Sequence, residues 1–336
     1  MAAPHVAGAW AILKQKNPTA TVGQVLNALQ TTGIKITDTR QGANNRVHCR
    51  IQIDQALNNI PEPVVTIPIA ESIAYGINNC GQIVGTQYVA GNNPGAKGFI
   101  TDTTMNSFTL FSYNGPVEDA TTVVEDTYAY SIDNTGRVSG TFCCNNGVPW
   151  WGARGFWRSA DGNYSLSIYP NSKISHAYGN NDSGATVGFA WSDEWPDNIY
   201  YVWQGNGTTI VSDTDFPRDI NNRGRYVGYF DADSIGPYIG FYTDGIGNRQ
   251  VFSYPGSSNT FINGINESGQ MVGYYDTGPN CQVCSAFVLN PDGTASTIQI
   301  PGAAGTVAWG LNDSGQIVGH YWTVDNVRHG FVDLRW

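Results

Sequence analysis

The sequence has few charged side chains. Asp, Glu, Lys and Arg make up 13% of its 336 residues, about half of the roughly 25% found in typical soluble proteins. Basic residues are the scarcer kind, with 17 Lys and Arg against 27 Asp and Glu, and the net charge is −10. A basic surface for nucleic acid or for an anionic membrane is therefore not expected. No run of about 18 apolar residues occurs, so no segment is predicted to span a bilayer.

Glycine and aromatic residues are abundant instead. The chain contains 40 Gly, 18 Tyr, 13 Phe and 10 Trp. Aromatic residues favour strands and glycine favours tight turns. This composition predicts an all-β protein and argues against a helical bundle or a nucleotide-binding α/β enzyme.

A repeat is the strongest pattern in the sequence. It reads AYGINNCGQIVGTQ from Ala74 and occurs six times, the last copy beginning AWGLNDSGQIVG at Ala308. Successive copies are 40 to 55 residues apart, which is the length of one four-stranded propeller blade. The sequence therefore predicts a six-bladed β-propeller. The aligned polar turn residues are Asn78, Asp133, Asn181, Asn221, Asn266 and Asn312.

Each repeat predicts four strands. The Asn-x-x-Gly segment, as in residues 78–81, predicts a hairpin between the first and second strands, because Asn accepts local backbone hydrogen bonds and Gly takes positive φ. A Gly-Phe pair such as Gly98 and Phe99 marks the third strand. A fourth strand is expected at 108–113, 164–169, 208–211, 249–254 and 295–300.

The sixth repeat stops after its third strand. The segment 64–69 matches the fourth strand at 296–301, so we expect residues 64–69 to pair with 330–335 and close the ring. An open stack of sheets, or a sandwich, is the alternative. The predicted domains are a helical segment, residues 1–60, and the propeller, residues 61–336.

The repeats resemble the HAF family of bacterial extracellular repeats, whose units carry G-I-N-x-x-G-Q-I-V-G followed by G-F. The resemblance covers residues 62–336. It implies export and a non-catalytic surface or secreted role.

Residues 1–57 have a different character. The sequence MAAPHVAGA from Met1 resembles the end of subtilisin-like serine proteases, which carry Gly-Thr-Ser immediately before this motif. The nucleophilic Ser, the His and Asp motifs and the oxyanion Asn of that family all precede Met1 in family order, and His5 is not the family's catalytic histidine. No catalytic residue is therefore assigned, and this chain is not expected to be a peptidase. The resemblance implies that the chain is the C-terminal part of a larger secreted protease.

Helices are expected in this segment, with Thr21 and Gln24 as a capping box for one that runs to about Thr31, and a short piece at 51–57. In the family the first helix lies in an α/β core. Without that core, Val6, Trp10, Ile12 and Leu13 are expected to lack partners within the segment, and to pack on the propeller, pack on another chain or stay disordered.

The loops between second and third strands are the predicted recognition surface. They vary in length and bring aromatic residues beside acids, which suits sugar rings or extended peptides. The alternative is that each Trp fills a gap between blades. The enzymatic alternative is that two acids of these loops form a glycosidase pair; the loop acids also include Asp197, Asp233 and Asp325. The candidate binding residues are Trp150, Trp151, Trp191, Asp193, Glu194, Trp195, Asp231, Tyr238, Asp276 and Trp322.

The Asn-x-x-Gly hairpins are interpreted as structural, because they lack the several carboxylates that calcium requires. Disulfides are predicted between Cys281 and Cys284 and between Cys49 and Cys80. Cys143 and Cys144 lie on the second blade and Cys281 and Cys284 on the fifth, so a shared zinc site is not expected. No metal or cofactor is predicted.

The leading expectation is a secreted, non-catalytic binding propeller that contacts glycan or protein. The alternatives are a serine endopeptidase in a full-length form, a hydrolase that uses loop carboxylates, and a structural protein that self-associates through its N-terminal helix.

Overall fold

The computed structural model describes residues 2–17, 20, 22–32, 34–38, 46–59, 64–89, 95–117, 124–144, 152–192, 198–203, 208–212, 214–231, 236–244, 248–278 and 284–334. The chain divides into two compact units, one formed by Met1–Val65 with Asp333–Trp336 and the other by Thr66–Val332. Among the described residues, no helix is long and apolar enough to cross a membrane.

The N-terminal unit contains three helices and a hairpin. The elements are α1 (Ala2–Lys16), α2 (Val22–Thr32), β1 (Ile34–Asp38), β2 (Arg46–Arg50) and α3 (Ile53–Asn59). Helix α1 ends at Lys16, and the side-chain oxygen of the next residue, Asn17, accepts a hydrogen bond from the amide of Ala20 at 3.0 Å. The β1–β2 hairpin was not predicted, although Ile34 and Ile36 alternate with polar residues, as strands do.

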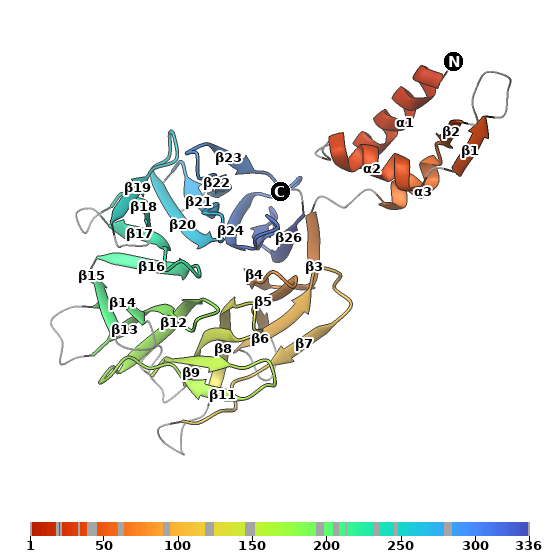
Figure 1. Ribbon diagram of the computed structural model, residues 1–336. Coiled ribbons are helices and arrows are strands. Elements are labelled where there is room, and N and C mark those ends of the chain that lie inside the picture. Colours follow the sequence, from red (N-terminus) through yellow and green to blue (C-terminus); the bar gives the residue numbers. More distant parts are fainter. Residues whose placement is uncertain are drawn as a thin grey trace. The chain divides into compact units, whose positions relative to one another are not determined.

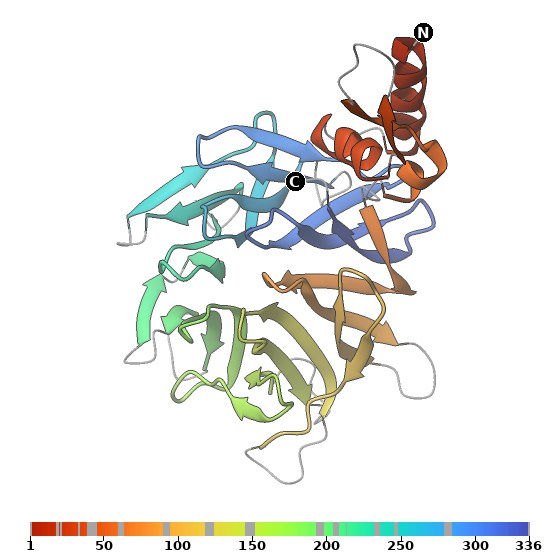
Figure 2. The ribbon, with the colours of Figure 1, turned by 45° about the vertical axis from the view of Figure 1, so that its right-hand side comes forward.

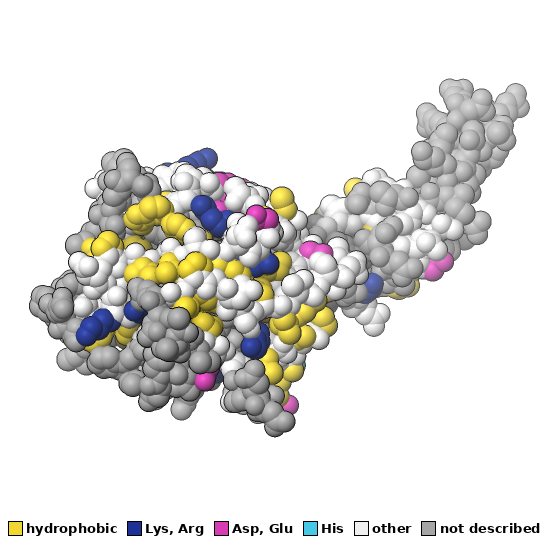
Figure 3. Space-filling model, turned by 90° about the horizontal axis from the view of Figure 1, so that it is seen from below, with side chains coloured by type: hydrophobic (Ala, Val, Ile, Leu, Met, Phe, Trp, Pro, Cys, Tyr) yellow, Lys and Arg dark blue, Asp and Glu magenta, His cyan; other side chains and the backbone are white. Residues whose placement is uncertain are grey.

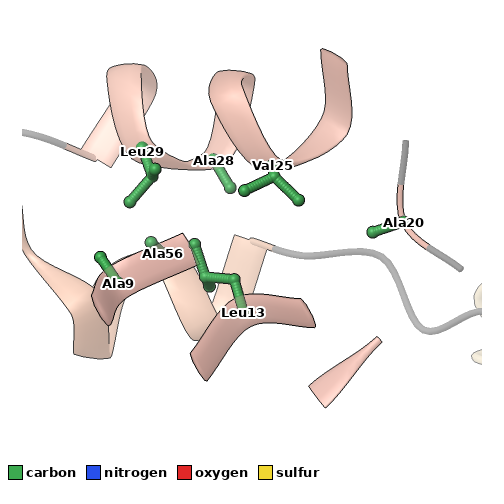
Figure 4. Packing of buried hydrophobic residues seen from close by; sticks show 7 residues of the cluster. All are labelled: Ala9, Leu13, Ala20, Val25, Ala28, Leu29 and Ala56. Carbon is green, nitrogen blue, oxygen red and sulfur yellow. The ribbon is translucent and has the colours of Figure 1, made fainter. Parts of the chain in front are cut away.

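The helical unit has a small core of its own, which corrects the expectation for Leu13. Leu13 is fully buried, and with Ala9 of α1 it packs against α2 and α3 (Figure 4). Trp10 is partly buried against the same cluster. Small residues on α2 and α3 let the helices approach closely enough to bury it. Val6 and Ile12, on the other side of α1, are 45% and 41% exposed. The buried cluster is Ala9, Leu13, Ala20, Val25, Ala28, Leu29 and Ala56.

The second unit is a six-bladed β-propeller, as the repeat predicts (Figures 1 and 2). Blade 1 contains β4 (Ser72–Ile77), β5 (Gln82–Val89), β6 (Gly95–Asp102) and β7 (Phe108–Phe111). Blade 2 contains β8 (Val124–Ile132), β9 (Val138–Cys144), β10 (Arg154–Arg158) and β11 (Tyr164–Leu166). Blade 3 contains β12 (Ile174–Asn180), β13 (Thr186–Trp191), β14 (Ile199–Trp203) and β15 (Thr208–Ser212).

Blade 4 contains β16 (Asp215–Ile220), β17 (Tyr226–Asp231), β18 (Tyr238–Thr243) and β19 (Arg249–Phe252). Blade 5 contains β20 (Asn259–Ile265), β21 (Met271–Asp276), β22 (Cys284–Leu289) and β23 (Ala295–Ile298). Blade 6 contains β24 (Gly305–Leu311), β25 (Ile317–Trp322) and β26 (Arg328–Asp333), and β3 (Val64–Ala70) lies beside β26 as its fourth strand.

The phenylalanine of the third strand fills the middle of five blades, and blade 3 has Tyr201 there instead. Phe99 on β6 pairs across the ladder with Gly85 on β5, and its ring lies where a side chain at residue 85 would project. Phe156 and Gly140 make the same pair in blade 2. The ring covers the bare glycine backbone and is excluded from water. The phenylalanines of five blades, Phe99, Phe156, Phe241, Phe287 and Phe331, are completely buried.

Apolar clusters join neighbouring blades. Ile298 and Val272 of blade 5 pack with Ala308 and Ile317 of blade 6, for example. Some hydrophobic side chains also reach the outer surface, where they lie among Lys and Arg side chains on the side shown in Figure 3.

Candidate functional site

Every blade has a β-bulge at the same position of its first strand. In β4 the register with β5 shifts between Ala74 and Gly76, which leaves Tyr75 as the extra residue. The same shift occurs in β8, β12, β16, β20 and β24. A bulge adds one residue and re-aims its side chain. The six bulged residues, called here the bulge belt, are Tyr75, Tyr130, Tyr178, Arg218, Asn263 and Trp309.

The bulge explains the burial pattern of the first strands. Ala129 and Ile132 belong to one buried cluster, as do Ala308 and Leu311 in blade 6. Residues three apart face opposite sides of a regular strand. The extra residue between them restores the same side, and the bulged side chain turns toward the axis of the propeller.

All six residues of the bulge belt line one central cavity of about 430 Å³. That volume lies within the range of small-molecule sites. The tips of the Asn-x-x-Gly hairpins line its other end, and most of them are exposed, so the cavity opens on the hairpin face. These tip residues, called here the mouth ring, are Asn79, Asn134, Asp182, Asn222, Glu267 and Asp313.

The aromatic members of the bulge belt touch one another in sequence around the ring. The ring centroids of Trp309 and Tyr75 are 5.1 Å apart, those of Tyr75 and Tyr130 are 5.3 Å apart, and those of Tyr130 and Tyr178 are 5.5 Å apart. All three contacts are edge-on, a favourable geometry for aromatic pairs. Together the four rings form one side of the cavity lining.

Arg218 lies near the two ends of this row of aromatic rings. Its guanidinium carbon lies 4.8 Å from the ring centroid of Tyr178 in blade 3 and 5.9 Å from that of Trp309 in blade 6. Nη2 donates a hydrogen bond to Tyr229 Oη at 2.9 Å. Nε is buried without a hydrogen-bond partner, and no carboxylate of the described residues forms an ion pair with this side chain.

Asn263 supplies an unpaired acceptor to the same cavity. Its side chain is 4% exposed, and Nδ2 donates to the main-chain oxygen of Ala308 at 2.9 Å. Its Oδ1 is buried and has no partner. Buried polar atoms are almost always hydrogen-bonded, so the unpaired Oδ1 and the unpaired Nε of Arg218 together indicate a place for a polar ligand.

Arg218 carries the positive charge of the cavity interior. Burial, followed by the nearby Arg218, lowers the pKa of His176 to about 4, so this imidazole is neutral at pH 7. Burial raises the pKa values of Tyr75, Tyr130 and Tyr178, which are also neutral. An arginine is always protonated in a protein.

Asp219 lies in the cavity lining next to Arg218. Its Oδ1 accepts from the amide of Ile220 at 2.9 Å and its Oδ2 from the amide of Ile265, in the next blade, at 3.0 Å. Burial raises the pKa of this carboxyl to about 7 against the effect of the two donors. Four other blades have glycine at this position.

An inner ring of hydrogen bonds holds the blades together beneath the mouth. The side-chain amide of Asn78 donates to the main-chain oxygen of Asp133 in the next blade, at 3.0 Å. The same bond is repeated from Asn181, Asn221, Asn266 and Asn312, and the last of these returns to Asn78. Asp133 has no amide, and Arg137 donates the sixth bond.

The mouth ring forms a second circle, which is complete. Each main-chain amide donates to a side-chain oxygen of the next blade, as from Asn79 to Asn134 Oδ1 at 2.8 Å. The circle continues from residue 134 through 182, 222, 267 and 313 and back to 79, with distances of 2.6 to 2.9 Å. The closed circle of hydrogen bonds holds the mouth in place. Three of its six members are carboxylates, so the mouth is also acidic.

These two rings support the structural interpretation of the hairpins and add to it. Asn78 Oδ1 accepts from the amides of Cys80 and Gln82 within its own turn, while its amide group reaches the next blade. The residue that follows each of these Asn or Asp residues lines the cavity. Among the described residues, no group of three or more His, Cys, Asp or Glu side chains is placed to hold a metal ion.

The described members of the predicted loop site do not line the cavity. Asp276 is buried, and both its oxygens accept hydrogen bonds from Asn259. Asp231 accepts from the amide of Gly236 at 2.9 Å. Asp276 therefore joins the ends of β20 and β21, and Asp231 bonds to the segment that leads into β18. Trp150, Trp151, Asp193, Glu194 and Trp195 lie outside the described residues.

The three aromatic candidates lie near blade surfaces. The centroid of the Tyr238 ring lies 5.3 Å from that of Phe261 in the next blade. Trp322 lies over Gly305 on the paired strand of its own blade. Trp191 is partly buried at the end of β13.

The predicted disulfides have different outcomes. Cys80 is an exposed free thiol at the third position of its hairpin, so the predicted bridge with Cys49 is wrong. Its turn position places the thiol at the surface. Cys284 is disulfide-bonded, and Cys281, its predicted partner, lies outside the described residues.

Sequence reasoning missed the bulge belt, although one signal pointed to it. Within the repeats, the residue before the belt position is Ala in four blades, and the residue after it is Gly in four blades. The belt position itself varies between Tyr, Arg, Asn and Trp. A large, variable residue within a constant frame is the pattern expected where a scaffold presents different side chains to a ligand.

No protein-family model and no curated protein matches this chain. Solved structures resemble it at a distance. A gluconolactonase from Xanthomonas campestris aligns over 80% of this chain and 89% of its own, with 14% identity and a TM-score of 0.46. The propeller domain of the Trilobed protease from Pyrococcus furiosus aligns over 89% and 88%, with 10% identity and a TM-score of 0.49. Trypanosoma rangeli sialidase aligns over 89% and 57%, with 9% identity and a TM-score of 0.47. Similarity this distant supports no functional argument.

Proposed function

We propose that the propeller is a non-catalytic binding module that holds its ligand in the central cavity. The observation that carries this proposal is the convergence of six bulged side chains, one from each blade, on a single cavity. A bulge costs ladder hydrogen bonds, and bulges are common next to functional sites. Six bulges at one position suit a site whose lining can change without altering the blades.

The groups in the cavity favour binding over catalysis. His176 Nδ1 lies 3.0 Å from Thr141 Oγ1, which resembles a base beside a nucleophile, but Thr141 is completely buried and cannot reach a substrate. Asp219 has the raised pKa of a general acid. However, a main-chain amide donates to each of its oxygens, which holds the carboxyl against the cavity wall as a structural group.

The sequence resemblances extend the proposal to the setting of the module. We propose that the chain is exported, and that the propeller follows a subtilisin-like protease domain and contacts a glycan or a protein. In that setting endopeptidase activity belongs to the upstream domain. The 336-residue chain is then expected to show no labelling with a serine-reactive fluorophosphonate, and labelling would contradict this part of the proposal.

Self-association is a second candidate, supported by the exposed faces of the helical unit. Val6 and Ile12 on α1, and Val22 and Leu26 on α2, are 41% to 70% exposed. Sedimentation of the full chain against a Val6→Ser, Ile12→Ser variant tests this candidate. A concentration-dependent dimer that the variant abolishes would support it.

A comparison of two tryptophans tests the central site. The full chain is titrated with panels of neutral glycans, acidic glycans and short peptides, with isothermal calorimetry as the readout. The cavity predicts that Trp309→Ala abolishes binding of any ligand found and that Trp322→Ala leaves it unchanged. Binding that is lost in Trp322→Ala and kept in Trp309→Ala would place the site on the outer loops. Failure to bind any ligand of the three panels would contradict the proposed function.

A further inference from the structure

We propose that the ligand is a short peptide of about three residues that enters the central cavity with its C-terminal carboxylate first. This inference rests on the proposed function and specifies its ligand. Three features along the cavity carry it: an unpaired cation at depth, an unpaired acceptor beside it and a ring of carboxylates at the mouth.

The deep end of the cavity suits a carboxylate. Arg218 lies in the bulge belt, its Nε is unpaired, and among the described residues its Nη2 donates to the hydroxyl of Tyr229. A buried cation without a counter-ion is costly. A guanidinium offers two parallel donors that match the two oxygens of a carboxylate. The rings of Tyr178 and Trp309 hold its plane in the cavity.

The neighbouring acceptor suits a peptide amide. Asn263 lines the cavity, and its Oδ1 is buried and lacks a partner, while Nδ2 donates to Ala308. A ligand that donates a hydrogen bond to this oxygen would satisfy it. A peptide has main-chain N–H donors adjacent to its carboxylate.

The mouth suits an ammonium group. Asp182, Glu267 and Asp313 contribute three carboxylates to the mouth ring. The exposed Arg223 lies 4.0 Å from Glu267, which is a weak surface pair. Arg137 also acts on Asp182, but its guanidinium pairs with Asp133 at 2.8 Å. A simple anion would be repelled here. A zwitterion, with its positive end outward and its negative end inward, matches both ends of the cavity.

The length of the cavity selects among zwitterions. Arg218 and Asn222 are four residues apart on a strand and turn that run toward the mouth. At about 3.3 Å per residue, and with one residue taken up by the bulge, the two levels are separated by about 10 Å. An extended peptide of three residues spans about this distance, whereas a free amino acid is too short to reach both ends.

A matched ligand series on the full chain tests the inference without any mutation. Trialanine, its C-terminal amide and its N-acetyl form are titrated by calorimetry at low salt, with a trimer of galacturonate as the comparison. We expect trialanine to bind, the amide to bind at least tenfold more weakly and the N-acetyl form several-fold more weakly. Equal affinity of the acid and the amide would overturn the inference.

Two arginine variants locate the carboxylate. Arg218→Gln removes the charge while nearly preserving the volume, and trialanine binding should fall at least tenfold. Arg328→Gln changes an exposed arginine of β26 that does not line the cavity, and binding should be unchanged. Unchanged binding in Arg218→Gln would also overturn the inference. If Arg218→Gln fails to fold, as judged by circular dichroism, the ligand series decides alone.

The series also separates this inference from the proposed function. Binding of galacturonate without trialanine, lost in Trp309→Ala, would overturn the peptide and leave the central binding site standing. Binding of neither, together with a negative glycan and peptide panel, would overturn both.

Discussion

Arg137 donates a hydrogen bond from Nη2 to the main-chain oxygen of Asn181 at 2.8 Å, across the boundary between blades 2 and 3. It stands where the other blades use a side-chain amide, because Asp133 has only oxygens to offer. The same guanidinium lies 2.8 Å from Asp133 Oδ2 and neutralises that buried carboxylate. Arg137 thus supplies the inter-blade hydrogen bond that a side-chain amide at residue 133 would make, and it also neutralises the Asp133 carboxylate.

Arg137→Ala is therefore expected to destabilise the propeller by about 3–5 kcal/mol, because it leaves Asp133 buried without its cation. The double variant Asp133→Asn, Arg137→Gln restores the Asn and Gln found in blades 1, 5 and 6 and should lose less than about 1 kcal/mol. Urea unfolding of both variants measures the difference. If the double variant is as unstable as Arg137→Ala, the Asn and Gln pair cannot replace Asp133 and Arg137 in the inner ring.

Gly85→Ala tests the Gly-Phe pair. A methyl group at residue 85 would meet the main-chain oxygen of Ile73 at 2.1 Å and the Phe99 ring at 2.5 Å. Neither neighbour can move freely, since Phe99 is fully buried, so a loss of about 3 kcal/mol or more is expected. Gly278→Ala is the matched control, because nothing lies within 4 Å of a methyl group there. Thermal melts should show a large shift for the first variant and none for the second.

The different success of the sequence predictions has a physical basis. The hairpins and the Gly-Phe pairs depend on contacts within one repeat, so each of six copies carries their signal. Asn78, for example, makes the turn bonds that its type and spacing predict. The inner ring was not foreseen, because its bonds run between blades and use the same side chain a second time.

The central cavity could not be predicted from alternation. In a regular strand residues 74 and 77 face opposite sides, but the bulge at Tyr75 changes this register, so both Ala74 and Ile77 are buried while the Tyr75 ring lines the cavity. One extra residue reverses the direction of every side chain after it. The burial of Asp276 could not be predicted for a related reason: its hydrogen-bond partner, Asn259, lies on the paired strand, 17 residues away in the sequence.

His320 is expected to make the folded chain less stable as the pH falls. Trp309 Nε1 donates to His320 Nδ1 at 3.1 Å, so the imidazole must be neutral at that nitrogen. Burial, with a smaller contribution from Arg328, lowers the pKa of His320 to about 3. Since the unfolded chain has a histidine pKa near 6.5, this contribution to stability is complete above about pH 6.5. It is lost as the pH falls from there to about 3.

The expected slope is about 1.4 kcal/mol per pH unit for one such histidine. His320→Gln keeps an acceptor for Trp309 but does not titrate. Urea unfolding at pH 5.0 and 6.5 should therefore show a weaker pH dependence in the variant than in the wild type. The remaining dependence is expected from His176, whose pKa is lowered in the same direction, and from Asp219, which acts in the opposite direction. Equal slopes in the two proteins would contradict the assignment.

Asp219 is expected to make the stability of the folded chain depend on pH in the opposite direction. Burial raises its pKa to about 7 from an ordinary value near 3.8, so the folded chain binds this proton more tightly than the unfolded chain. The contribution is fully present below about pH 4 and is lost as the pH rises to about 7. Asp219→Gly introduces the residue found in four other blades and removes the titration. The stability difference, wild type minus variant, should decrease between pH 5 and pH 7, and a difference that increases would mean that the two amide donors keep Asp219 ionised.

The strand β3 tests how the propeller closes. It lies beside β26 in the sheet order, Ile67 is 1% exposed, and the amide of Gly330 donates to Ser72 Oγ just beyond β3. A chain that begins at residue 64 keeps this strand, whereas one that begins at residue 71 leaves β26 as an open edge and exposes the site of Ile67. We expect the first to unfold in urea as cooperatively as the full chain, and the second to lose more than about 3 kcal/mol and to aggregate through its free edge. Equal stability of the two truncated chains would show that the inner ring and the mouth ring close the propeller without β3.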